Sequence, residues 1–83
     1  MADRQEIYNV ISEHLKARGV DTAEMTPKSS LYDDLDLDSL ETVELTLGLE
    51  ERFNIEIPDT DLENVTTVDD AVDLIENKLA AHA

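Results

Sequence analysis

Apolar residues recur with helical spacing in three stretches of this chain, and residues typical of helix termini flank each stretch. The first predicted helix runs from about residue 4 to residue 18, with an apolar face made of Ile7, Val10, Ile11 and Leu15. Asp3 precedes it as a candidate N-cap, Glu6 follows three residues later, and Gly19 stands just beyond the last turn. This pattern predicts an amphipathic helix with one buried side.

The second predicted helix runs from Ser39 to about Phe53, with Asp38 as its N-cap. One apolar row is assigned to the core because its members follow a strict i, i+4, i+8 spacing: Leu45, Leu49 and Phe53. A second row is interleaved with glutamates and consists of Leu40, Val43 and Leu47. Apolar side chains within an acidic field are typical of a protein-docking surface, and the alternative is that all or part of this row packs inside.

The last predicted helix begins after Thr66 or Thr67, and its inward face consists of Val68, Ala71, Val72, Ile75 and Leu79. Residues 80–83 are expected to fray. Pro58 opens a short helical turn that continues to about Asn64, since proline suits a first helical turn. The alternating segment 54–58 is interpreted as an extended loop, because it is short and has no evident pairing partner.

The segment between the first two helices, residues 20–37, has no sustained period and contains the helix-disfavouring pair Thr26-Pro27. A connection of this length in a compact domain is usually functional. Its apolar residues are expected to hold it against the core: Val20, Met25, Leu31, Leu35 and Leu37. The whole pattern predicts one domain over residues 1–83, an all-α bundle of three main helices and one short helix without strands.

Composition limits the partners of such a domain. The 83 residues include 21 acidic and 6 basic side chains, for a formal net charge of −15. Nucleic acid is excluded as a ligand because it needs clustered Lys and Arg, and an anionic membrane is disfavoured for the same reason. The acids concentrate between residues 33 and 63, where Arg52 is the only base, so proteins with basic patches are the expected partners. The chain shows no cysteine, targeting segment or apolar run of membrane-spanning length, and a cytoplasmic monomer is expected.

Ser39 is the centre of the candidate chemistry. It follows alternating aspartates and leucines and begins a helix, where unpaired N–H groups and the helix dipole favour anionic groups. A phosphate ester on its hydroxyl would lie in that field. A hydrolase would need a histidine base and a Gly-x-Ser-x-Gly elbow, but His14 and His82 are distant in sequence and the elbow is absent. We therefore expect Ser39 to be modified rather than catalytic, and we expect no catalytic residue in the chain.

The aspartates before Ser39 also suggest a calcium loop. Asp34, Asp36 and Asp38 match the first, third and fifth positions of an EF-hand. The sixth position, which needs glycine, is Ser39, and the twelfth, which needs glutamate, is Leu45. We predict no dedicated metal site, while weak binding of divalent cations by the many carboxylates stays open.

The segment Asp38-Ser39-Leu40-Glu41-Thr42-Val43-Glu44-Leu45, followed by Leu49-Glu50-Glu51-Arg52-Phe53, resembles the attachment-site helix of acyl carrier proteins of the fatty acid synthase type. The resemblance continues through residues 55–59 and 65–68 and covers the chain end to end. It implies that a phosphopantetheinyl transferase attaches a 4′-phosphopantetheine arm from coenzyme A to Ser39. The terminal thiol of that arm would hold acyl groups as thioesters, sheltered between the helices. An aliphatic core around Leu45, Leu49 and Val65 is compatible with such shelter.

The resemblance also implies which residues contact partner enzymes: Asp38, Leu40, Glu41, Val43, Glu44, Leu47, Glu50, Glu51, Ile57 and Glu63. The expected partners use basic patches and comprise the phosphopantetheinyl transferase, malonyl transferase, ketoacyl synthase, ketoreductase, dehydratase, enoyl reductase and acyltransferases. Three residues depart from the commonest pattern of the family: Gly48, Arg52 and Leu62. We interpret Gly48 as permitting close packing rather than softening the helix.

Two other interpretations stay open at this point. The first is a carrier of polyketide type, and the second is an acidic protein-binding adaptor without a prosthetic group, in which Ser39 is only part of a helix start. A peptidyl carrier is disfavoured because the approach Leu35-Asp36-Leu37-Asp38 contains no glycine.

Overall fold

The structure, a computed structural model, describes residues 3–82 except for the side chains of Asp59 and His82. Its helices are α1 (Arg4–Ala17), α2 (Ser39–Phe53), α3 (Asp59–Leu62) and α4 (Val68–His82). Over these residues the only β-type pairing is an isolated bridge between Ser30 and Thr67. The predicted all-α architecture of three main helices and one short helix is therefore confirmed.

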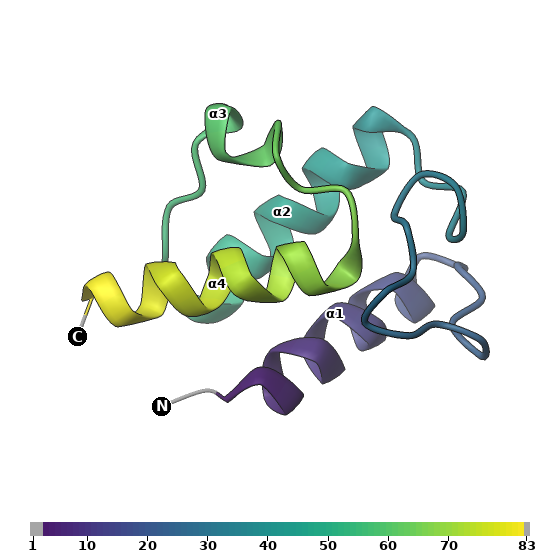
Figure 1. Cartoon of the computed structure of the whole chain (residues 1–83), viewed down its shortest axis with the longest axis horizontal. Coiled ribbons are helices and arrows are strands. Elements are labelled where there is room, and N and C mark those ends of the chain that lie inside the picture. The colour runs from purple at the N-terminus through teal and green to yellow at the C-terminus, as the bar shows by residue number, and fades with distance from the viewer. Residues whose placement is uncertain (1–2, 83) are drawn as a thin grey trace.

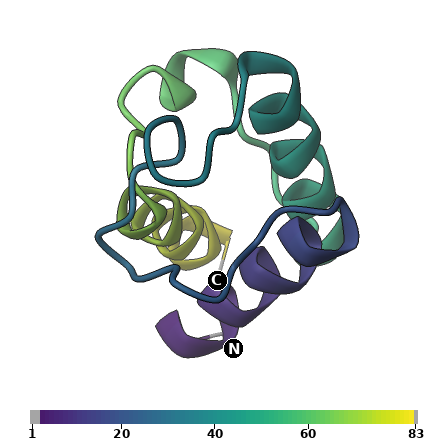
Figure 2. The same ribbon diagram turned by 90° about the vertical axis from the view of Figure 1, so that its right-hand side faces the viewer.

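Helix α1 packs against both α4 and α2 and runs in the opposite direction to them (Figure 1). Viewed from the end, α2 and α4 lie on opposite sides of the molecule, with α1 closing one gap between them and α3 the other (Figure 2). The core fills the space between these helices with aliphatic side chains, of which the most deeply buried are Ile7, Ile11, Leu15, Leu31, Val68 and Ile75. Burial of these side chains supplies the main driving force for folding.

Short polar side chains define where the main helices begin. The Asp3 carboxylate accepts the Glu6 N–H at 2.8 Å, and the Asp38 carboxylate accepts the Glu41 N–H at the same distance. Both predicted N-caps are confirmed. At its other end, α2 stops at Asn54, which adopts the left-handed conformation with φ 56°.

Helix α4 begins with a reciprocal cap. The Thr67 hydroxyl accepts the Asp70 N–H, while the Asp70 carboxylate accepts the N–H groups of Thr66 and Thr67. At the other end the helix continues through His82, the expected fraying of residues 80–83 stays a prediction, and Ala83 lies outside the described residues. None of the helices in residues 3–82 is long and apolar enough to cross a bilayer.

The long connection between α1 and α2 is held by the core and by α4. Leu31, Leu35 and Leu37 are buried, and Val20 and Met25 pack partly against the core, as expected. The bridge between Ser30 and Thr67 consists of two backbone hydrogen bonds, Leu31 N–H to Thr66 O at 2.8 Å and Val68 N–H to Ser29 O at 3.0 Å, and the Asp69 N–H adds a third bond by donating to Pro27 O at 2.7 Å. The connection thus crosses from the end of α1 to the start of α4 before it enters α2 (Figures 1 and 2).

Candidate functional site

Ser39 is the first residue of α2 and is exposed. Asp38 caps the start of this helix, and its backbone carbonyl accepts two hydrogen bonds from Thr42, one from the N–H at 3.0 Å and one from the side-chain hydroxyl at 2.9 Å. Within the described residues, the hydroxyl of Ser39 has no hydrogen-bond partner, and neither do the N–H groups of Ser39 and Leu40. The positive end of a well-capped helix is therefore left open beside an exposed hydroxyl.

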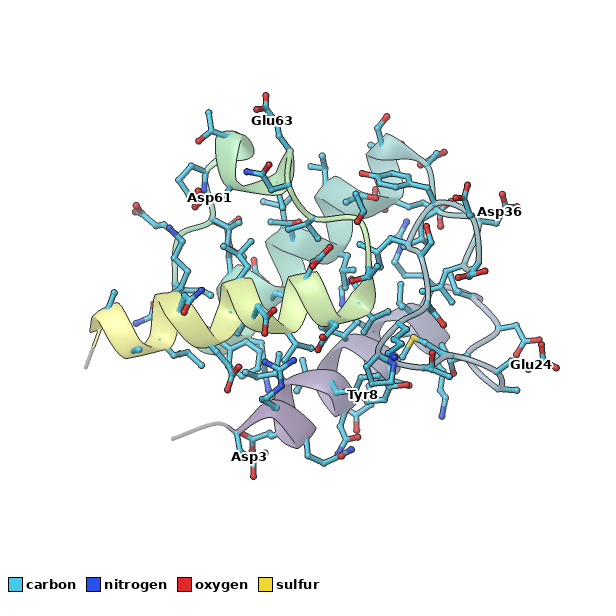
Figure 3. The ribbon with its side chains drawn as sticks, viewed as in Figure 1. Asp3, Tyr8, Glu24, Asp36, Asp61 and Glu63 are labelled. Atoms are coloured by element: carbon cyan, nitrogen blue, oxygen red, sulfur yellow. The ribbon has the colours of Figure 1, made fainter. Side chains whose placement is uncertain are left out.

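The approach to Ser39 alternates between buried leucines and exposed aspartates. Leu35 and Leu37 enter the core, and Asp36, which has φ 55°, lies at the outer edge of the loop (Figure 3). Asp34 accepts the Ser30 N–H at 2.6 Å. Because Asp34 and Asp38 bond to separate backbone groups, the aspartates of the EF-hand pattern do not converge. The structure brings together no group of three or more acids or histidines suited to a metal ion in residues 3–82.

Leucine and valine side chains of the second apolar row remain at the surface of α2. Leu40, Val43 and Leu47 are 65%, 43% and 55% exposed, so no part of this row packs inside. The inward face of α2 instead combines the predicted Leu45 and Leu49 with two residues that the sequence analysis missed, Thr42 and Thr46. Their positions complete an i, i+3, i+4, i+7 face, which was the available signal.

Several acids assigned to the docking surface have partners inside this chain. Asp38 caps α2, Glu50 accepts the Ile57 N–H at 2.9 Å, and Glu44 pairs with Arg18. Within the described residues, the carboxylates of Glu41 and Glu51 accept no hydrogen bond and form no ion pair. Some carboxylates of the acidic surface therefore already have a hydrogen-bond or ion-pair partner within the described residues, and others do not.

Two predicted contact residues outside α2 have different positions. Glu63 follows α3, is exposed and points away from the body of the molecule (Figure 3). Ile57 is only 7% exposed and belongs to the core, so it presents little surface to a partner in this conformation, and its assignment as a partner contact stays a prediction. The Glu50 carboxylate accepts the Ile57 N–H, so the backbone of this segment is bonded to the last turns of α2.

Comparisons with known proteins agree with this geometry. A family model described as the phosphopantetheine attachment site matches residues 5–75. An acyl carrier protein from Rubrobacter xylanophilus is 50% identical over 74 residues, covering 88% of this chain and 91% of the relative. The chain belongs to the acyl carrier protein family. An acyl carrier protein from Thermotoga maritima has the same fold, with a TM-score of 0.83 at 21% identity over 96% of this chain and 94% of the crystal structure.

Members of the acyl carrier protein family carry their cargo on 4′-phosphopantetheine and are not catalysts themselves. The surroundings of Ser39 fit a phosphodiester, because the hydroxyl is exposed and two unpaired N–H groups stand at the helix start. The imidazole of His14, a candidate base, packs against Gly48. Gly48 lies nine positions after Ser39 in α2, a rise of about 14 Å, so His14 is not placed as a base for the Ser39 hydroxyl.

The carrier also has a small apolar cavity between α2, α3 and α4. Its volume is about 20 Å³, and its walls include Thr42, Leu45, Thr46, Leu49, Leu62 and Ile75. The two threonine hydroxyls donate within α2, Thr42 to Asp38 O and Thr46 to Thr42 O, so they are satisfied although buried. Space of this size admits about one water molecule.

Proposed function

We propose that Ser39 is the attachment point of 4′-phosphopantetheine and that this carrier delivers acyl intermediates to the enzymes of fatty acid synthesis. The observation that carries the proposal is the exposed Ser39 hydroxyl at the capped, positive start of α2. When bound, the group supplies a terminal thiol that holds acyl chains as thioesters. The role of the chain itself is to present that arm and to be recognised.

The attachment chemistry belongs to a partner enzyme in this proposal. A bond forms between Ser39 Oγ and the phosphorus that bears pantetheine in coenzyme A, while the bond from that phosphorus to the bridging pyrophosphate oxygen breaks. Adenosine 3′,5′-bisphosphate leaves with the bonding electron pair, and the serine hydroxyl loses its proton. Because His14 packs on the α1–α2 interface rather than at Ser39, the base that takes this proton is supplied by the phosphopantetheinyl transferase. The N–H groups at the start of α2 favour the anionic product.

The docking surface that we propose for partner enzymes combines an apolar row with acids. The apolar row is Leu40, Val43 and Leu47, and the acids are Asp38, Glu41, Glu44, Glu50, Glu51 and Glu63. A basic enzyme surface complements this field, and the exposed leucines provide desolvated contact beside the attachment point. Candidate partners are the transferase, malonyl transferase, ketoacyl synthase, ketoreductase, dehydratase, enoyl reductase and acyltransferases.

The cavity between α2, α3 and α4 is the proposed shelter for a bound acyl chain. Its walls are aliphatic, and the hydroxyls of its two threonines are already hydrogen-bonded within α2, so the lining suits a hydrocarbon chain. Its volume of about 20 Å³ is too small for an acyl chain. Acyl binding therefore requires α2 and α3 to move apart. The segment that connects α2 to α4 contains only the four-residue helix α3. We therefore expect α3 and its flanking loops to be displaced more easily than the three long helices.

Intact mass spectrometry tests the attachment site. The apo carrier and a Ser39→Ala variant are incubated with coenzyme A and a phosphopantetheinyl transferase of broad specificity. We expect the wild type to gain the mass of one phosphopantetheinyl group and the variant to gain none. A mass gain in Ser39→Ala would move the site elsewhere, and no gain in the wild type, beside a known carrier that is modified, would favour the adaptor interpretation. Loading of the holo form by malonyl transferase and extension by ketoacyl synthase then tests the fatty acid assignment.

A further inference from the structure

An arginine at the end of α1 forms an ion pair with one of the acids of the docking surface. Arg18 forms the C-cap of α1, and its Nη2 pairs with Oε2 of Glu44 on α2. The backbone around Arg18 is fixed, because the N–H groups of Arg18 and Val20 both donate to Leu15 O, at 3.1 and 2.9 Å. The pair therefore links the end of α1 to the middle of the surface that begins at Ser39.

Glu44 has a central place on that surface. It follows Val43 directly and precedes Leu47 by three residues, so it lies beside two exposed apolar contacts. The flanking acids Glu41 and Glu51 have no ion-pair partner in the part of the chain that the structure describes. A basic enzyme surface would thus meet the unpaired carboxylates of Glu41 and Glu51 and, between them along the helix, Glu44, whose charge is already compensated by Arg18.

The compensation of the Glu44 charge by Arg18 is weak. Both side chains are partly exposed, and exposed ion pairs of this kind contribute little and are screened by salt. A partner with a well-placed basic side chain can therefore exchange with Arg18, whereas a partner without one meets a neutralised position.

We propose that Arg18 is a specificity-determining residue of docking, because it competes with partner side chains for Glu44. Partners that replace Arg18 use Glu44, and the others depend on the remaining acids and the leucines. This inference rests on the proposed function, since it assigns a role within the same docking surface. The surface selects partners through a contact within the carrier as well as through the charge it displays.

A four-protein cycle measures this competition: wild type, Arg18→Gln, Glu44→Gln and the double variant. The readout is kcat/KM of the phosphopantetheinyl transferase for each apo carrier at fixed coenzyme A and low salt. Lys16→Gln is the matched control, because it removes one positive charge from the exposed end of the same helix and Lys16 forms no ion pair in the described residues. General attraction to a basic enzyme changes equally in Arg18→Gln and Lys16→Gln.

We expect Arg18→Gln to raise kcat/KM about two- to fivefold above Lys16→Gln, as removal of a weak competitor predicts. We expect Glu44→Gln to lower kcat/KM about twofold or less in the wild type but about fivefold or more in the Arg18→Gln background. Equal values for Arg18→Gln and Lys16→Gln, with additive effects in the cycle, would overturn the proposal.

Two further measurements keep the result interpretable. Urea unfolding of each variant shows whether the fold is retained, and Arg18→Lys, which keeps the charge without the planar fork, is expected to give an intermediate kcat/KM.

Mass gain of the wild type reports separately on the proposed function. If the wild type is modified at Ser39 and the cycle is additive, the competition proposal fails alone. If the wild type is not modified, the function proposal fails first, and the competition proposal, which assumes it, falls with it.

Discussion

The imidazole of His14 occupies the space that a side chain at Gly48 would need. An ideal Cβ placed on Gly48 would lie 2.4 Å from Cε1 and 2.8 Å from Nδ1 of the His14 ring. The interpretation of Gly48 as a close-packing position is therefore confirmed. The Nε2 atom of His14 is buried at this α1–α2 contact without a hydrogen-bond partner in the described residues, which adds a desolvation cost to the arrangement.

Gly48→Ala is expected to have opposite effects in two backgrounds. Where His14 is replaced by Ala, the substitution should stabilise the carrier by about 0.5–1 kcal/mol, because Ala favours a helix interior over Gly. Where His14 is present, the new Cβ must displace the ring, so this gain should be lost or reversed. Urea unfolding of the four proteins checks the coupling, and equal effects of Gly48→Ala in both backgrounds would contradict the packing relationship.

Leu31 should contribute as much to stability as a residue of a core helix. It is 1% exposed although it lies in the connection, and its backbone bonds to Thr66. Leu31→Ala is expected to cost about 2–5 kcal/mol of unfolding free energy. The adjacent Tyr32, which is 42% exposed, provides the control, and Tyr32→Ala should cost less than about 1 kcal/mol. Similar losses for both variants, measured by urea unfolding, would show that the connection is not part of the core.

Asp70 should make the start of α4 sensitive to acid. Hydrogen bonds from the Thr66 backbone, opposed by partial burial and helped by the N–H of Thr67, hold the pKa of Asp70 below its ordinary value. A lowered native pKa stabilises the fold above the unfolded value of about 3.9, and that stabilisation is lost as pH falls through the native value. Asp70→Asn should therefore cost about 0.5–2 kcal/mol at neutral pH, with the difference from wild type shrinking below about pH 4.

Urea unfolding of Asp70→Asn from pH 7 to pH 2 measures this dependence. Glu51→Gln is the matched control, because it removes an exposed carboxylate that accepts no hydrogen bond in residues 3–82 and should change stability by less than about 0.5 kcal/mol. A constant difference between Asp70→Asn and wild type across the whole range would show that the carboxylate charge does not stabilise the cap.

Leu47 should matter for partners and not for folding. Because it is 55% exposed on the docking surface, Leu47→Ser is expected to change unfolding free energy by less than about 0.5 kcal/mol. The same substitution should lower kcat/KM of the phosphopantetheinyl transferase by about tenfold, since it removes apolar contact worth about 1–2 kcal/mol. Unchanged kinetics in a folded Leu47→Ser carrier would remove Leu47 from the docking surface.

The sequence by itself determined the helices, their starts and the position of Ser39, because these features depend on neighbours within one or two turns. Asp3 and Asp38 could be recognised as caps since the N–H groups they accept lie three residues away. The bounds of α2 follow from the same local rules. The missed inward positions Thr42 and Thr46 show the limit, since hydroxyl residues were not counted toward an apolar face.

The tertiary structure alone decided the contacts between residues far apart in the chain. Only the fold of residues 3–82 brings His14 to Gly48, Arg18 to Glu44, and Ser30 beside Thr67. It also buried Ile57, whose backbone N–H donates to a carboxylate seven residues earlier. Spacing along one helix predicts which side chains share a face, but which face meets another helix depends on how the whole apolar surface is buried together.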